Sequence, residues 1–105
     1  MTVEMGIRHR ETGTYQVVPV ATSETFRKVW LPASERLGLE WVAHLHDGAL
    51  TRVPPEVVPH LIGELQRLRA WACEHQELAP PVERIDSLLR AFRETDPTLC
   101  DYDFG

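Results

Sequence analysis

The chain has 105 residues, of which 43% are hydrophobic and 26% charged, and this composition is typical of a folded domain rather than a disordered segment. Sixteen acidic residues against eleven basic ones give a formal net charge of −5, which argues against a nucleic-acid partner because phosphates require a basic surface. No apolar run approaches the roughly 20 residues of a membrane span. We therefore predict one domain over residues 1–105, with no nucleic-acid partner and no membrane span.

The N-terminal residues and the cysteine content predict a cytoplasmic location. The first residues, MTVEMGIRHRETG, carry charges throughout and lack the apolar core of a signal peptide. The only cysteines are Cys73 and Cys100, too few for a disulfide framework. Among the eleven basic residues only Lys28 is a lysine, a bias typical of GC-rich genomes, so we predict a bacterial source.

Residues 3–20 have the pattern of a β-hairpin. Apolar and other residues alternate over residues 3–8, and the segment TYQVVPV of residues 14–20 is rich in β-branched side chains. The sequence ETG between them supplies turn chemistry. Pro19 cannot donate to a β-ladder, so its strand should end there or lie at a sheet edge.

A helix should follow the hairpin. Ser23 can accept a hydrogen bond from the free N–H groups of a first helical turn, and Phe26, Val29 and Trp30 recur at helical spacing. Pro32 should break or kink this helix, because proline has no N–H group to donate. Gly38 is a typical C-terminal stop.

Residues 39–53 predict a second hairpin. Residues 39–46 alternate like a strand, and residues 49–53 provide the partner strand. The Asp47-Gly48 dipeptide between them favours a type I′ turn, because both central positions of that turn need positive φ. The resulting register would pair His46 with Ala49 and His44 with Thr51.

Two helices and a final strand complete the pattern. Three prolines crowd the start of a helix running to about His75, where first-turn N–H groups have no intrahelical partner. A second helix should place apolar residues inward from Val82 to Phe92, and the tail LCDYDFG alternates like a strand. The element order ββα-ββ-αα-β predicts an α+β domain with a mainly antiparallel sheet and helices packed on one face.

Two histidines and an aspartate at the predicted turn form a candidate metal site. On a strand, His44 and His46 would project to the same side about 7 Å apart, and Asp47 could help to complete the site. Zinc accepts such groups but usually needs three or four ligands. We favour the alternative in which these side chains line the solvated face of a hairpin, so neither a metal nor a cofactor is predicted.

The C-terminal segment carries the candidate binding site. Tyr102 stands between two aspartates on a strand that we expect at a sheet edge. Tyrosine supplies contact area with a polar tip, and carboxylates steer a basic partner; a merely solvated tail is the alternative. We predict no catalytic residue, and the expected partner-binding residues are Asp96, Asp101, Tyr102 and Asp103.

Tryptophans and arginines are further candidates for a surface role. We expect Trp41 in the core and at least one of Trp30 and Trp71 at the surface. Five arginines would give the helical layer a locally basic face, although we favour ordinary helix solvation: Arg67, Arg69, Arg84, Arg90 and Arg93. Glu64, three residues before Arg67, fits a surface ion pair.

The runs WLPASERLGLEWVAHLHDG and PPEVVPHLIGELQRLRAW, with the DYDFG ending, resemble the immunity proteins, small cytosolic α+β proteins of bacterial polymorphic-toxin loci. The resemblance implies a protein that binds its cognate toxin and blocks it, with no cofactor and no turnover. It carries no site residue over to this chain. Our hypothesis is an immunity-type inhibitor; the alternatives are a small metal-dependent enzyme using His44 and His46 and an acidic secretion chaperone.

Overall fold

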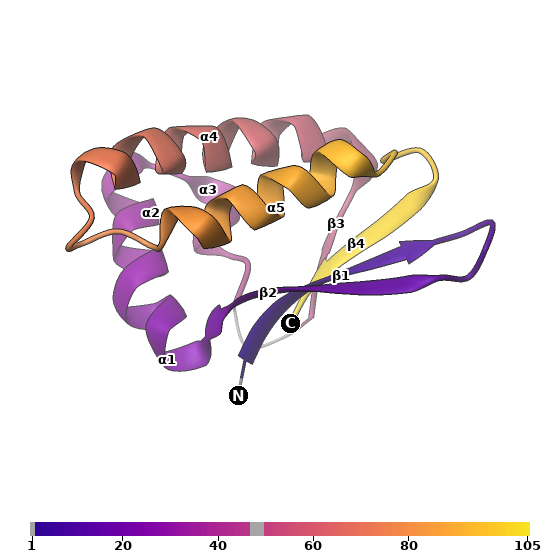
Figure 1. The fold of residues 1–105 in the computed structure, drawn as a ribbon, viewed down its shortest axis with the longest axis horizontal. Helices are drawn as coiled ribbons and strands as arrows, with labels where there is room; N and C mark the ends of the chain where they lie inside the picture. Colours follow the sequence, from indigo (N-terminus) through magenta and orange to yellow (C-terminus); the bar gives the residue numbers. More distant parts are fainter. Residues whose placement is uncertain (1, 47–49) are drawn as a thin grey trace.

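Residues 2–46 and 50–105 are described in the computed structural model, and their strands form one antiparallel sheet in the order β2-β1-β4-β3 (Figure 1). The strands are β1 (Thr2–His9), β2 (Tyr15–Thr22), β3 (Thr51–Val53) and β4 (Cys100–Phe104). The helical segments are α1 (Ser23–Thr25), η1 (Phe26–Trp30), α2 (Leu31–Leu37), α3 (Glu40–Ala43), η2 (Pro55–Val57), α4 (Val58–Glu74) and α5 (Val82–Glu94). The predicted α+β class is confirmed.

The N-terminal hairpin is confirmed. Strands β1 and β2 pair antiparallel from Thr2 opposite Thr22 to Arg8 opposite Tyr15, with a bulge beside Glu4. Gly13 adopts a φ of 72° in the connecting turn, a conformation that glycine takes without steric cost. Strand β2 is an edge strand, as Pro19 within it predicted.

Pro32 does not break the first helical region, which ends at Gly38 as predicted. Thr22, rather than Ser23, caps its start, and the Thr22 hydroxyl accepts a hydrogen bond from the backbone N–H of Thr25. Segment η1 is a π-helix, and Pro32 follows it in the first turn of α2, where proline is tolerated. Gly38 ends α2 with a φ of 68°, as expected of a helix C-cap.

The strand predicted for residues 39–46 is wrong. Residues 40–43 form the short helix α3 instead, and the backbone then turns at residues 44–46. Leu39, Val42 and Leu45 are buried, a spacing of three that fits a helical turn better than a strand. The predicted pairing of His44 with Thr51 is also wrong, because Thr51 pairs with Phe104 of β4. Asp47, Gly48 and Ala49 lie outside the described residues.

The C-terminal strand is confirmed, but its predicted place at a sheet edge is wrong. Strand β4 lies between β1 and β3 and pairs with both. Its alternating residues Cys100, Tyr102 and Phe104 are buried against the core, while Asp101 and Asp103 point the other way. A central position pairs the backbone hydrogen-bonding groups of β4 on both sides.

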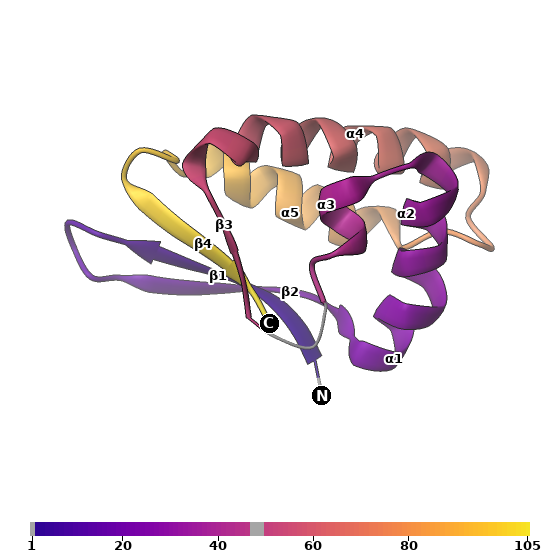
Figure 2. The same ribbon diagram turned by 180° about the vertical axis from the view of Figure 1, so that it is seen from behind.

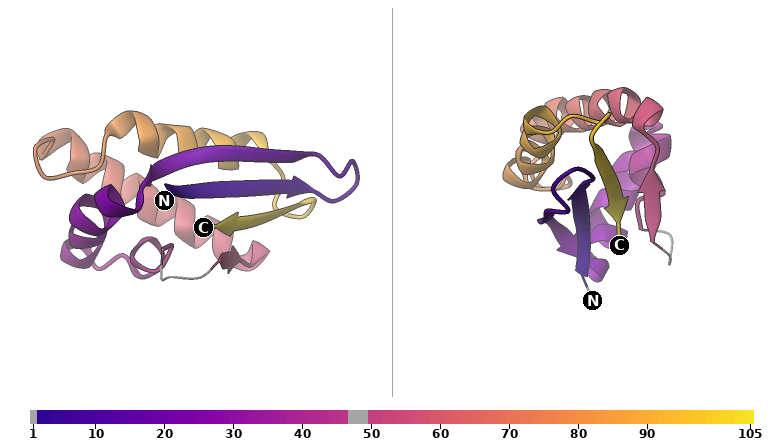
Figure 3. Two further views of the ribbon diagram at one scale, coloured as in Figure 1. Left: turned by 90° about the horizontal axis from the view of Figure 1, so that it is seen from below. Right: turned by 90° about the vertical axis from the view of Figure 1, so that its right-hand side faces the viewer.

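Helices α4 and α5 lie side by side over one face of the sheet, as predicted, with α1 and α2 at one end (Figures 1 and 2). Figure 3 shows the sheet curving beneath them, and no described helix covers its other face. No helix in the described part of the chain is both long enough and apolar enough to cross a membrane. The core between the layers includes Met5, Ile7, Trp30, Leu61, Leu65, Leu68, Ile85, Leu88, Tyr102 and Phe104.

The burial of the tryptophans differs from the expectation at Trp41, which is less buried than Trp30. Trp30 is fully buried and stacks with Phe26 at a centroid distance of 6.0 Å. Trp41 and Trp71 are only partly buried at the margin of the core. The helical spacing of Phe26 and Trp30 predicted their shared side, but not that this side faces the centre of the molecule.

Candidate interaction surface

The face of the sheet that no described helix covers presents one continuous set of side chains. Cross-strand partners in an antiparallel sheet share a face, and the registers link Arg8 to Tyr15 and Asp101, and Gly6 to Val17 and Asp103. We call this surface the open sheet face. Its residues are Glu4, Gly6 and Arg8 of β1, Tyr15, Val17 and Pro19 of β2, Arg52 of β3, and Asp101 and Asp103 of β4.

An aromatic and an aliphatic side chain are exposed on the β2 side of the open sheet face. Tyr15 is 52% exposed and Val17 is 45% exposed. The Arg8 guanidinium stands 5.8 Å from the centroid of the Tyr15 ring, within the range of a cation–π interaction. This contact favours one position of the ring on the surface.

Gly6 lets the Tyr15 side chain lie across the neighbouring strand. A Cβ atom at position 6 would overlap the Tyr15 hydroxyl and would lie 2.6 Å from Oδ1 of Asp103. The missing side chain therefore makes room for both groups over β1. The alternating pattern of residues 3–8 does not reveal this role of Gly6, although a glycine inside a strand often marks such a close approach.

Charges of both signs surround the exposed apolar groups. Asp101 forms an ion pair with Arg10, with 3.6 Å between Nε and Oδ1, and both side chains are about half exposed. Arg52 lies directly opposite Asp103 in the register. The face is therefore mixed in charge, and the acidic character of the chain belongs to the molecule as a whole.

The four predicted partner-binding residues do not form one cluster. Asp101 and Asp103 lie on the open sheet face, whereas Tyr102 points to the opposite side and is 1% exposed. The Tyr102 hydroxyl is 2.6 Å from the Thr95 hydroxyl, and burial raises the pKa of the phenol above its usual value. Tyr102 is therefore a core residue and offers no area to a partner.

Asp96 has a local structural role in the turn that precedes β4. Its Oδ1 accepts hydrogen bonds from the backbone N–H of Thr98 at 2.9 Å and from the Thr98 hydroxyl at 2.8 Å. These bonds lower the pKa of the Asp96 carboxyl, the backbone bond most strongly. Such an aspartate initiates a turn, which explains the TDP sequence without a partner.

The weak metal candidates His44 and His46 lose the geometry that suggested them, and Asp47 lies outside the described residues. His44 and His46 follow α3 in a turn rather than on a strand, so the spacing of two no longer places them on one side. His46 packs edge-on against Phe26 at 5.8 Å, while exposed His44 lines a shallow hollow of about 370 Å³ with Glu40 and Trp41. Within residues 2–46 and 50–105, no three His, Cys, Asp or Glu side chains are grouped to hold a metal ion.

We expect metal-free and zinc-supplemented protein to melt at the same temperature. A ligand that binds only the native state must raise the melting temperature by mass action, so an unchanged value indicates no native zinc site. Differential scanning calorimetry with stoichiometric zinc measures this directly. A clear rise that His44→Ala abolishes would instead support the metal-dependent alternative.

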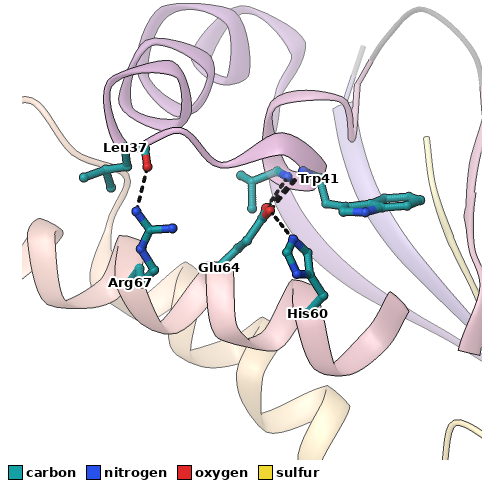
Figure 4. A network of polar contacts seen from close by, with 6 residues as sticks. Leu37, Trp41, His60, Glu64 and Arg67 are labelled. Carbon is teal, nitrogen blue, oxygen red and sulfur yellow. Dashed lines mark hydrogen bonds and ion pairs between the residues drawn. The ribbon is translucent and has the colours of Figure 1, made fainter. Parts of the chain in front are cut away.

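Glu64 is a buried carboxylate, so the predicted surface ion pair with Arg67 is wrong. It is 5% exposed, and Oε1 accepts hydrogen bonds of 3.0 Å from the N–H groups of Trp41 and of Val42 (Figure 4). Oε2 lies 2.9 Å from Nε2 of His60. Arg67 bonds elsewhere, to the carbonyl of Leu37 at 2.7 Å.

This network fixes α3 and Trp41 against α4. The two N–H groups belong to the first turn of α3, where no intrahelical acceptor exists, so the carboxylate caps a helix distant in sequence. The position of Glu64 between the buried residues Leu61, Leu65 and Leu68 was the available signal, because a charge within an apolar stripe needs partners.

A thiol and an imidazole meet where β1 and β4 pair. Sγ of Cys100 lies 3.3 Å from Nδ1 of His9, its cross-strand partner. Cys100 is 1% exposed, and a substrate must reach a nucleophile before it can react. The pair therefore resembles a Cys–His dyad in distance but lacks the access that nucleophilic catalysis requires.

Comparisons with known proteins assign no family to this geometry. No family model, curated protein or solved structure matches the chain.

Proposed function

We propose that the protein is a noncatalytic binding module that inhibits a partner enzyme, as an immunity protein inhibits its cognate toxin. One observation carries the proposal: the open sheet face has exposed Tyr15 and Val17 beside Asp101 and Asp103, and no described helix covers it. Aromatic residues are enriched at protein interfaces, where they form the apolar centre, and charged residues form the rim.

The surface is preorganised for binding. Gly6 makes room for the Tyr15 ring and Arg8 stands beside it, so little side-chain freedom remains to be lost on association. The sheet beneath is tied to the core through Met5, Ile7 and Phe104, which supports a rigid contact face. A rigid, partly apolar face suits stoichiometric blocking of an enzyme, which needs affinity rather than turnover.

The net charge of −5 favours a partner with a basic surface, such as the substrate groove of a nuclease. On the open sheet face itself carboxylates alternate with guanidinium groups, so steering comes from the whole molecule. Asp101 and Asp103 then act at the rim, where a charge changes mainly the association rate.

Titration against a neighbouring enzyme tests the proposal. The purified chain is added to the purified enzyme encoded beside its gene, and the activity of that enzyme is followed. The expected result is a stoichiometric loss of the enzyme's activity, while this chain alone forms no product in the same assay. Unchanged activity at a large excess of the chain, with no complex in gel filtration, would contradict the proposal.

We expect Asp101→Ala and Asp103→Ala each to weaken the complex about fivefold while leaving the melting temperature nearly unchanged. The association rate should fall as salt rises, because screening weakens the attraction between exposed charges. Stopped-flow measurements give both the strength of the complex and its association rate. Glu35→Ala removes an exposed carboxylate of α2, which is not part of the open sheet face, and serves as the control. An equal effect of Glu35→Ala would show only a net-charge effect.

A further inference from the structure

A groove between α4 and α5 gathers guanidinium groups on the solvent side of the helical layer. It has a volume of about 430 Å³ and is lined by Gln66, Arg69, Asp86, Leu89, Arg90 and Arg93. A smaller hollow of about 200 Å³ continues it and shares Gln66, Leu89 and Arg93, adding Ile62. The groove therefore combines a cationic wall with the partly buried apolar side chains Ile62 and Leu89.

The groove stabilises a negatively charged carboxylate, as its own residue Asp86 shows. Its carboxylate accepts two hydrogen bonds from Arg69, at 2.5 Å from Nε and 3.4 Å from Nη2. The Arg69 hydrogen bond, with lesser contributions from the charges of Arg69, Arg90 and Arg93, lowers the pKa of the Asp86 carboxyl. One carboxylate thus stands among three guanidinium groups.

Arg90 and Arg93 keep the capacity to bind a second anion. Both are exposed, and within the described ranges neither forms an ion pair or side-chain hydrogen bond. They lie three residues apart on α5, so their side chains project from one side of the helix toward the groove. Arginine binds carboxylates through two parallel hydrogen bonds, which gives directional as well as electrostatic recognition.

We infer that the groove between α4 and α5 is a second binding site, which takes an acidic and apolar segment of a protein. Carboxylates of the segment meet Arg90 and Arg93, and an apolar side chain lies on Leu89 and Ile62. The site is separate from the open sheet face and does not depend on the proposed inhibition. A chain with both sites can hold an acidic segment while its sheet contacts another surface.

Fluorescence anisotropy with a labelled peptide of glutamate and leucine tests the inference on the full chain. The same peptide with glutamine for glutamate is the ligand control. We expect Arg90→Ala and Arg93→Ala each to weaken binding of the glutamate peptide about fivefold, and raised salt to weaken it further. Arg84→Ala removes an exposed arginine of α5 that does not line the groove, and it should leave binding unchanged.

Asp86→Asn supplies a test with the opposite sign. It removes the carboxylate that occupies Arg69, so binding of the glutamate peptide should become several-fold tighter rather than weaker. The Tyr15→Ala variant should bind the peptide like the wild type. The inference is wrong if the glutamine peptide binds equally well, if Arg84→Ala weakens binding as Arg93→Ala does, or if a single-stranded oligonucleotide binds more tightly than the glutamate peptide.

Discussion

Glu64→Ala should lower the free energy of unfolding by about 2–4 kcal/mol, measured by urea denaturation followed with circular dichroism. The wild-type carboxylate accepts hydrogen bonds from the N–H groups of Trp41 and Val42 and contacts His60. Alanine leaves these donors without that acceptor, and Val42 is fully buried, so water cannot readily replace the lost bond. We expect α3 to loosen, which should also shift the fluorescence of Trp41.

Two further variants separate this network from a general effect of losing a glutamate. Glu64→Gln keeps one oxygen that can accept the α3 N–H bonds, so it should cost less, about 1 kcal/mol. Glu74→Ala removes an exposed glutamate of the same helix and should change stability by no more than about 0.5 kcal/mol. Equal effects of Glu64→Ala and Glu74→Ala would show that the carboxylate does not hold α3.

Tyr102→Ala should destabilise the fold by about 3–5 kcal/mol, as removal of a large buried aromatic ring typically does. Tyr102 lies on the central strand β4, and its ring packs against Phe92 at a centroid distance of 5.1 Å. The substitution leaves a cavity between sheet and helices that neighbouring residues can fill only in part. Thermal and urea unfolding measure the loss, and a stable Tyr102→Ala variant would contradict the placement of this ring in the core.

Tyr102→Phe distinguishes the ring from its hydroxyl. It removes only the hydrogen bond to Thr95, so the expected loss at neutral pH is about 1 kcal/mol. If Tyr102 instead contacted a partner, as the sequence suggested, Tyr102→Ala would weaken binding without affecting unfolding. Measuring both properties on both variants decides between the two roles.

The buried phenol of Tyr102 should also make stability depend on alkaline pH. Burial raises its folded-state pKa, so the unfolded chain loses this proton first. The stabilisation of the fold by the neutral phenol is present below the unfolded pKa of about 10. It is lost as pH rises through the folded pKa. Urea unfolding above pH 10 should therefore show a steeper loss of stability for the wild type than for Tyr102→Phe, and equal slopes would contradict this assignment.

Elements with local sequence signals could be predicted. The hairpin of β1 and β2 has strand alternation and a glycine that adopts positive φ in its turn, and α4 and α5 have apolar stripes with proline or turn residues at their ends. The Asp47-Gly48 dipeptide predicted a hairpin strand for the preceding segment, but residues 40–43 form a helix. Alternation over so short a stretch also fits a helical spacing of three, and the cap from Glu64 lies 22 residues away from Val42.

The candidate site could be predicted only in part. Alternation correctly set Asp101 and Asp103 on one side of a strand and Tyr102 on the other, but not which side the helices cover. The central place of β4 depends on long-range pairing with β1 and β3, which no local pattern encodes. Tyr15 and Val17 were missed because an exposed strand residue becomes part of a surface only when its cross-strand neighbours are known.

The affinity of Tyr15→Ala for the partner enzyme tests the central claim most directly. Isothermal titration calorimetry should show a Kd about thirtyfold higher than that of the wild type, as expected for an aromatic residue near the centre of an interface. Leu78→Ala removes a similarly exposed apolar side chain outside the open sheet face and should leave Kd unchanged, and both variants should melt like the wild type. An unchanged Kd for Tyr15→Ala, or an equal loss with Leu78→Ala, would contradict the claim that the open sheet face is the binding surface.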